Sequence, residues 1–206
     1  MLAELSPGPV TLVGYSWGAL LAMLYAIEAT AGRAGPVPAR MVLLDPAPAS
    51  RAFRDRFEAE FARRQASPEI AALREQLAAS GLRESDPAAF RQRTFELSVA
   101  GYFADPARAR DLTPFRVTGR VQQSVWESLG EFDIVTALRD LRVPSLVVHG
   151  KQDPIPLASA AAVAAALAAQ VLWLDDCGHV PYVEQPGEMF ASIRIFLDDT
   201  ESLVHD

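Results

Sequence analysis

The chain of 206 residues has little of several residue types that often reveal function: one cysteine, one lysine and three histidines. The single Cys177 excludes an intrachain disulfide and any metal site built from several cysteines, and it suits a reducing compartment. The first six residues lack the basic start and long apolar run of a signal peptide. The longest apolar candidate for a membrane span, 157–174, is mostly alanine and ends beside two aspartates. We therefore expect a cytoplasmic protein without a membrane segment.

The chain also lacks a surplus of positive charge. It carries 19 basic and 26 acidic residues, a net charge of −7, whereas a nucleic-acid-binding protein usually shows a basic surplus. Hydrophobic residues make up 50% and charged residues 22% of the sequence, which is ordinary for a globular protein and excludes disorder, collagen and coiled coil. A chain of this length can bury a core as one domain, or as one domain with an insert.

Short β-branched runs alternate with helix-compatible segments near both ends of the chain. The expected strands are 10–13, 41–44, 145–149 and 171–174, and the expected helices are 19–29, 157–169 and 188–197. Strand, helix and strand in this order form βαβ units, which predict an α/β fold with a mostly parallel sheet.

The middle of the chain has a different character. It holds no convincing strand, and residues 51–120 carry 13 arginines against 10 acids. Ser67, Asp86 and Asp105 each stand before a proline, a pattern typical of helix starts. We expect 51–129 to be a helical insert with a solvated charged face. The core would then consist of 1–50 and 130–206.

Residues 14–18 read Gly-Tyr-Ser-Trp-Gly, a G-x-S-x-G pattern between an expected strand and an expected helix. A sharp turn at this place lifts the Ser16 hydroxyl clear of the backbone. Gly14 and Gly18 are expected because strand and helix pass too closely for a β-carbon. The backbone N–H of Trp17 lies at the start of the helix, where it can stabilise an oxyanion. The pattern therefore predicts a nucleophilic serine.

A nucleophilic serine needs a base, and the base needs an orienting partner. Asp153 and His179 each follow an expected strand, and the carboxyl ends of parallel strands share one edge of the sheet. The chain order of serine, aspartate and histidine is the order expected for this turn. We predict that His179 acts as the base for Ser16 and that Asp153 orients it.

Other polar residues near these positions have simpler interpretations. Asp45 also ends a strand and is the rival for the acid role. His149 is expected to be a packed or hydrogen-bonded histidine, and the aspartates at 175–176 to shape the loop before the candidate base. Cys177 is expected to be a small buried thiol. His205 lies in a polar tail, which we expect to be disordered.

Three segments, 14–18, 150–156 and 178–186, resemble the α/β-hydrolase superfamily. The resemblance extends over nearly the whole chain and implies a mostly parallel sheet with a helical cap inserted at 51–129. It also implies that Ser16, Asp153 and His179 are the catalytic residues, with the Trp17 N–H as one oxyanion donor. Neither a metal nor an organic cofactor is implied.

Within the superfamily, Trp17, the helical cap and the sequence Leu-Leu-Asp-Pro-Ala at 43–47 are most similar to the proline iminopeptidase-like branch. Esterases, lactonases and C–C bond hydrolases share the same catalytic residues. The serine at position 16 disfavours the haloalkane dehalogenases and epoxide hydrolases, because their nucleophile is an aspartate.

The resemblance implies a serine hydrolase that cleaves a carboxylic ester or a small amide through an acyl-enzyme. The expected partner is thus a small-molecule ester or a short peptide, and not a nucleic acid or a membrane. An alternative is an aminopeptidase acting on N-terminal proline, which needs an acid in or under the cap to bind the free amine. Candidates for that acid are Glu58, Glu60, Glu69, Glu75 and Glu96.

Members of the superfamily place several strands and an oxyanion loop ahead of the nucleophile strand, which here begins at Val10. Three explanations are open: a fragment or a start assigned too late, a second chain that covers the open edge, or a rebuilt family fold. We expect the first of these. The second oxyanion donor is not present in this sequence. Losing one such donor typically lowers turnover by roughly 10²–10³. A third hypothesis follows: a catalytically weak remnant that forms a homodimer through the open strand edge at 10–13.

Overall fold

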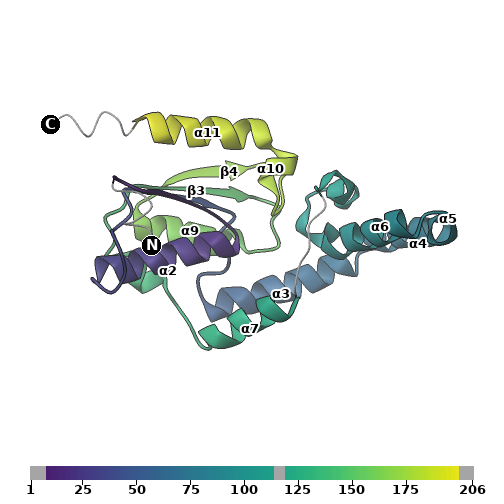
Figure 1. Ribbon diagram of the computed structural model, residues 1–206, viewed down its shortest axis with the longest axis horizontal. Helices are drawn as coiled ribbons and strands as arrows, with labels where there is room; N and C mark the ends of the chain where they lie inside the picture. Colours follow the sequence, from purple (N-terminus) through teal and green to yellow (C-terminus); the bar gives the residue numbers. More distant parts are fainter. Residues whose placement is uncertain (1–7, 114–118, 200–206) are drawn as a thin grey trace.

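The computed structural model describes residues 8–113 and 119–199, and their central element is a four-stranded parallel sheet (Figure 1). The strands follow each other across the sheet in sequence order: β1 (Thr11–Tyr15), β2 (Arg40–Leu44), β3 (Ser145–Gly150) and β4 (Gln170–Leu174). Every neighbouring pair is parallel. The predicted α/β fold with a parallel sheet is confirmed.

Helices lie on both faces of the sheet and beyond one of its ends (Figure 1). The helices associated with the sheet are α2 (Trp17–Thr30), α8 (Val135–Leu138), α9 (Leu157–Leu167), α10 (Pro181–Glu184) and α11 (Pro186–Asp198). Between β2 and β3 come α3 (Arg51–Gln65), α4 (Pro68–Ala79), α5 (Leu82–Ser85), α6 (Pro87–Val99), the 3₁₀ helices η1 (Ala100–Tyr102) and η2 (Pro106–Asp111), and α7 (Gly119–Leu129). None of the helices in the described ranges is both long and apolar enough to cross a membrane.

Alternate residues of the two central strands pack on opposite helical layers. Leu43 of β2 and Val147 of β3 join the core formed with α2, α8 and α9. Val42 and Val148 point the other way, into the core formed with α11. Because both faces are covered, β2 and β3 are continuous apolar runs, as is typical of a parallel sheet. The carboxyl ends of the strands are thereby held in a fixed register.

The two outer strands are less protected. In the described part of the chain β1 pairs with β2 alone, and the Val13 side chain is 60% exposed. On the opposite edge, Val171 of β4 is 47% exposed. The free edge of β1 presents backbone groups that can pair with a further strand.

The helical region between β2 and β3 begins its helices where the sequence predicts. The Ser67 hydroxyl accepts a hydrogen bond at the start of α4, and the Asp86 carboxylate accepts two at the start of α6. Asp105 caps η2 in the same way, so the third predicted start is confirmed but leads into a 3₁₀ helix. Part of the predicted insert, 114–118, lies outside the described residues.

Strand β1 and helix α2 approach each other most closely at Gly14. A β-carbon at Gly14 would lie 2.4 Å from the Gly18 carbonyl oxygen and 2.5 Å from the backbone of Ala19. A β-carbon at Gly18 would meet no atom within 4 Å. The predicted need for glycine is therefore confirmed for Gly14 and wrong for Gly18, because a side chain at Gly18 would point into open space.

These two glycines provide a matched test of the strand–helix contact. We expect Gly14→Ala to lower the free energy of unfolding by roughly 3 kcal/mol, since its methyl group overlaps backbone atoms that cannot rotate away. Gly18→Ala should change it by less than about 1 kcal/mol, because alanine only improves helix propensity there. Urea unfolding of the three proteins measures both effects. Equal stability of Gly14→Ala and the parent would contradict the close approach.

Candidate active site

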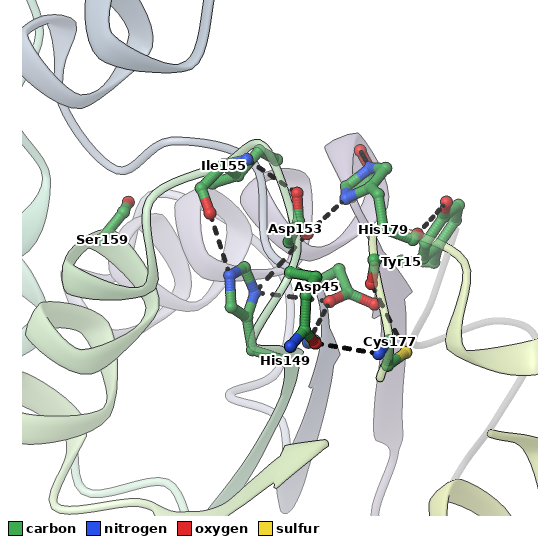
Figure 2. Close-up of polar contacts among 12 residues, drawn as sticks. Tyr15, Asp45, His149, Asp153, Ile155, Ser159, Cys177 and His179 are labelled. Carbon is green, nitrogen blue, oxygen red and sulfur yellow. Dashed lines mark hydrogen bonds and ion pairs between the residues drawn. The ribbon is translucent and has the colours of Figure 1, made fainter. Parts of the chain in front are cut away.

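Ser16, Asp153 and His179 meet at the carboxyl edge of the sheet, following β1, β3 and β4 respectively. The Nε2 atom of His179 lies 2.9 Å from the Ser16 Oγ, and its Nδ1 atom lies 2.7 Å from the Asp153 Oδ2. Figure 2 shows His179 and Asp153 directed toward one another. The structure thus brings all three sequence-predicted residues into one hydrogen-bonded chain.

The backbone at Ser16 is in the left-handed region, with φ 52° and ψ −114°. Such a conformation costs a non-glycine residue on the order of 1–3 kcal/mol. Backbone hydrogen bonds on both sides hold it: the Ser16 N–H donates to the Leu44 carbonyl at 2.9 Å, and the Ser16 carbonyl accepts from Ala47 at 3.1 Å. The turn is therefore fixed by β2 as well as by its own strand and helix.

Trp17 is the first residue of α2. Its backbone N–H belongs to the first turn, where N–H groups have no acceptor within the helix. Its indole ring packs on Trp126 of α7, with ring centroids 3.9 Å apart. The guanidinium of Arg54 lies over the Trp126 ring, 4.6 Å from its centroid. The side chain at position 17 thus joins the turn to the helices between β2 and β3.

Asp153 is buried, and both of its carboxylate oxygens accept hydrogen bonds. Oδ1 accepts from the Ile155 N–H at 2.7 Å, and Oδ2 faces the Nδ1 of His179. Burial raises the pKa of this carboxyl, and the Ile155 N–H is among the groups that lower it. An ionised Asp153 keeps the proton of neutral His179 on Nδ1, which leaves the Nε2 lone pair for the Ser16 hydroxyl.

His179 is enclosed by aromatic rings. Burial lowers its pKa to about 4, and the nearby Asp45 opposes this in part. The rings of Tyr15 and Tyr102 lie with their centroids 5.2 Å and 5.0 Å from that of the imidazole. The imidazole is therefore neutral at neutral pH and can accept a proton.

Both peptide groups of His179 are held by tyrosines. The Tyr15 hydroxyl donates to the His179 carbonyl at 2.6 Å, and the His179 N–H donates to the Tyr102 carbonyl at 2.7 Å. The neighbouring Gly178 packs so closely against Tyr102 that a β-carbon at Gly178 would lie 2.1 Å from the Tyr102 carbonyl oxygen. Sequence analysis missed both tyrosines. The one available signal was the position of Tyr15 directly before the serine.

Glu184 connects the His179 loop to the helices between β2 and β3. Its buried carboxylate accepts from the N–H of Gly178 at 2.6 Å, and from the N–H groups of Ala104 and Asp105 at 3.0 Å and 3.4 Å. Burial raises the pKa of this carboxyl, whereas these N–H donors lower it. This glutamate lies within the segment 178–186, but no sequence pattern there points to these contacts.

Asp45, the rival for the acid role, does not bond to His179. Its Oδ1 accepts from the Gly150 N–H at 2.9 Å, and the Nδ1 of His179 bonds to Asp153 instead. The interpretation of His149 as a packed, hydrogen-bonded histidine is confirmed. Its ring is buried, and its Nε2 atom lies 3.1 Å from the Ile155 carbonyl oxygen.

The remaining polar residues also have structural surroundings. Cys177 is a buried thiol, as predicted, and burial raises its pKa. The Asp175 carboxylate pairs with Lys151 at 2.8 Å, and Asp176 takes a positive φ of 48° in the same turn, so both shape the loop as predicted. His205 lies outside the described residues.

Three of the five glutamates considered for binding a free amine already face arginines. The pairs are Glu58 with Arg54, Glu60 with Arg63 and Arg64, and Glu96 with Arg93. Their negative charge is thus balanced from within the same helices.

One group of side chains within 8–113 and 119–199 has the geometry to hold a metal ion: Asp45, His149 and Asp153, with ligand atoms within 4.8 Å of one another. Three of its carboxylate oxygens already accept other hydrogen bonds, from the Gly150 N–H, the Ile155 N–H and His179. A cation bound here would compete with the hydrogen bonds that link Asp153 through His179 to Ser16.

Comparisons with solved structures show the same fold in several hydrolases. The chain aligns over 100% of its length with 70% of a proline iminopeptidase from Mycobacterium smegmatis, with 18% identity and a TM-score of 0.61. It aligns over 95% of its length with 70% of Est816, described as an N-acyl homoserine lactone degrading enzyme, with 19% identity and a TM-score of 0.57. It aligns over 93% of its length with 67% of an alpha/beta fold family hydrolase from Bacillus anthracis, with 18% identity and a TM-score of 0.61.

No curated protein sequence matches the chain. A family model does: the one described as "Alpha/beta hydrolase family" matches residues 1–193. With the parallel sheet and the serine turn between β1 and α2, this match shows that the chain belongs to the alpha/beta hydrolase family.

Proposed function

We propose that this protein is a serine hydrolase that cleaves carboxylic esters through an acyl-enzyme. The observation that carries the proposal is the continuous hydrogen-bonded chain from the Ser16 Oγ through His179 to Asp153. A serine hydroxyl beside a neutral imidazole, itself oriented by a buried carboxylate, is the arrangement that acyl-transfer chemistry needs.

In the proposed mechanism His179 accepts the hydroxyl proton at Nε2 while the Ser16 Oγ attacks the ester carbonyl carbon. Asp153 stabilises the imidazolium that forms, and the imidazolium then gives its proton to the departing alkoxide. The acyl group remains on the serine. A water molecule, deprotonated by His179, attacks the acyl carbon, and its proton returns to the serine as the carboxylic acid leaves.

We assign the Trp17 backbone N–H as an oxyanion donor. It is the first N–H of α2 and directly follows the nucleophile. A helix N-terminus favours negative charge, so the group suits the charge that develops on the carbonyl oxygen.

We also propose that 51–129 forms a cap over the site, on a core of 1–50 and 130–206. Aromatic rings of this region come close to the histidine: Phe61 lies 4.4 Å from Tyr102 between ring centroids, and Tyr102 lies 5.0 Å from His179. Such a wall favours an apolar acyl or alcohol group and excludes water from the base.

An aminopeptidase acting on N-terminal proline is the second candidate. The likeness of the fold to a proline iminopeptidase favours it, as does the sequence resemblance at Trp17. The arginine pairs of Glu58, Glu60 and Glu96 disfavour it, because an amine-binding acid must be available to the substrate. Turnover of an aryl ester of a short-chain acid against a prolyl arylamide separates the two candidates.

We predict that the protein hydrolyses the aryl ester faster than the prolyl arylamide. Ser16→Ala and His179→Ala should each lower kcat for the ester by at least about 10³-fold, because the nucleophile and its base act as one unit. Ser98→Ala, an exposed serine on α6, is the matched control and should keep the parent activity. Retention of parent activity by Ser16→Ala would exclude the proposed nucleophile.

The pH dependence of kcat/KM is expected to reflect the burial of His179. Only the neutral imidazole can accept the serine proton, and burial lowers its pKa to about 4. Protonation of His179 should therefore not limit activity at the ordinary histidine value of about 6.5. The acidic limb should instead lie near pH 6, where Asp153 takes up a proton, because burial raises its pKa to about 6. A kcat/KM profile between pH values near 4 and 9 provides the check. An acidic limb centred at or above the ordinary value would show that the imidazole is solvated.

We propose in addition that the isolated chain forms a homodimer through the β1 edge, where Val13 is exposed. Sedimentation at micromolar concentration should show self-association. Val13→Lys should weaken it, because a charged side chain on an edge strand opposes edge-to-edge pairing. Val171→Lys on the β4 edge is the matched control. Monomeric behaviour of the parent, or a larger effect from the control, would refute pairing at β1.

A further inference from the structure

A second polar cluster lies directly behind the hydrogen-bonded chain. Asp45 follows β2, His149 belongs to β3, and both side chains have 0% exposure. In Figure 2, His149 lies on the side of Asp153 opposite His179, and Asp45 lies below Asp153. Within the described residues, two buried side-chain atoms have no hydrogen-bond partner: Oδ2 of Asp45 and Nδ1 of His149. Buried polar atoms without a partner need an explanation, and a proton shared within the cluster provides one.

The partner of the other ring nitrogen defines the His149 tautomer. Nε2 lies 3.1 Å from the Ile155 carbonyl oxygen, which can only accept a hydrogen bond. Nε2 therefore carries a hydrogen, and in the neutral ring Nδ1 carries a lone pair. This nitrogen lies 3.4 Å from the Asp45 Oδ1 and 3.8 Å from the Asp153 Oδ2.

A lone pair between two ionised carboxylates would be repelled by both in a site that excludes water. One proton reduces the conflict, because on a carboxyl group it leaves a single ionised carboxylate beside the lone pair. The proton can stay on His149, which then carries a positive charge between two negative carboxylates, or it can stay on one carboxyl group. The net charge of the cluster is −1 in both arrangements, so the surroundings must select between them.

The surroundings favour the carboxyl group of Asp45. Burial raises the pKa of this group well above its ordinary value, and the charge of Asp153 raises it further. His179 and the Gly150 N–H lower this pKa, but by less than burial and Asp153 raise it. Burial lowers the pKa of His149, which disfavours a buried imidazolium.

The other titratable groups around the cluster select the same arrangement. Tyr15 on β1 and Cys177 stay neutral, because burial raises the pKa of each. Arg64 of α3 donates to the Gln152 carbonyl. Burial raises the pKa of Asp153 too, and the charge of Arg64 is among the influences that lower it. Both carboxylate oxygens of Asp153 face nitrogen donors, those of Ile155 and His179. Only one oxygen of Asp45 faces such a donor. Of the two carboxyl groups, Asp153 is therefore the one that ionises.

We propose that Asp45 holds a proton at neutral pH and donates it in a hydrogen bond to Asp153, which makes Asp45 a positioning residue that acts through Asp153 on His179. The protonated carboxyl lets two acidic side chains share the site while only the one that faces His179 carries charge. The positioning role rests on the proposed hydrolase function, whereas the protonation does not.

The first experiment measures protonation through stability and needs no substrate. A carboxyl whose folded-state pKa is raised stabilises the fold fully below its unfolded-state value, about 3.9, and this contribution is lost as the pH rises toward the folded-state value. The unfolding constant of the parent, divided by that of Asp45→Asn, should rise about tenfold per pH unit from roughly pH 4 to neutral pH.

Asp55→Asn provides the matched control, because Asp55 is exposed and paired with Arg51 at 2.9 Å. Its ratio to the parent should change little over the same range. A ratio for Asp45→Asn that stays flat or falls with rising pH would overturn the proposal, because it would show that Asp45 is ionised in the folded protein.

The second experiment measures positioning through kinetics on the aryl ester. The Asp45→Asn amide can donate to Asp153 as the protonated carboxyl does, so kcat/KM should stay within about tenfold of the parent, with an unchanged pH profile. Asp45→Leu cannot donate, so Asp153 should accept a proton at higher pH. The acidic limb of kcat/KM should then move to higher pH, with the loss in kcat rather than in KM.

Each kinetic outcome decides the positioning role. Equal damage by Asp45→Asn and Asp45→Leu would overturn it, as would full activity and an unshifted profile in Asp45→Leu. If the parent hydrolyses neither test substrate, the proposed function and the positioning role fail together. The pH dependence of unfolding then still decides where the proton lies.

Discussion

The short contact between Asp153 and the Nδ1 of His179 is the interaction on which the rest of the site depends. At 2.7 Å in a buried setting it sets the tautomer of the imidazole, and the tautomer directs the Nε2 lone pair toward Ser16. The two side chains follow different strands, so their contact needs β3 and β4 in their observed register. The apolar packing on both faces of the sheet keeps that register. The hydrophobic core and the polar site are thus two results of the same parallel sheet.

The helical region between β2 and β3 also holds His179 in place for its contact with Asp153. Tyr102 accepts from the His179 N–H, and Glu184 bonds to backbone N–H groups of both the histidine loop and the helical region. A movement of these helices would therefore be transmitted to His179. In the proposed function, the region that shapes the substrate site also holds the histidine in place.

Much of this could be predicted from the sequence, because local patterns carried it. The strands were visible as apolar runs, and the capping residues Ser67, Asp86 and Asp105, each followed by a proline, marked helix starts. The roles of Tyr15 and Glu184 could not be predicted, since each depends on a contact that only the folded chain creates. The role expected for Gly18 was wrong because the pattern does not show on which side of the turn the backbones approach.

The central claim is that this chain assembles a reactive Ser16. Intact-mass measurement after exposure to a fluorophosphonate probe tests it most directly, because the probe reacts with a serine activated by its base and does not depend on the substrate. The account predicts a single adduct on the folded parent protein and none on Ser16→Ala. Absence of an adduct on folded parent protein, or an adduct that persists in the alanine variant, would contradict it.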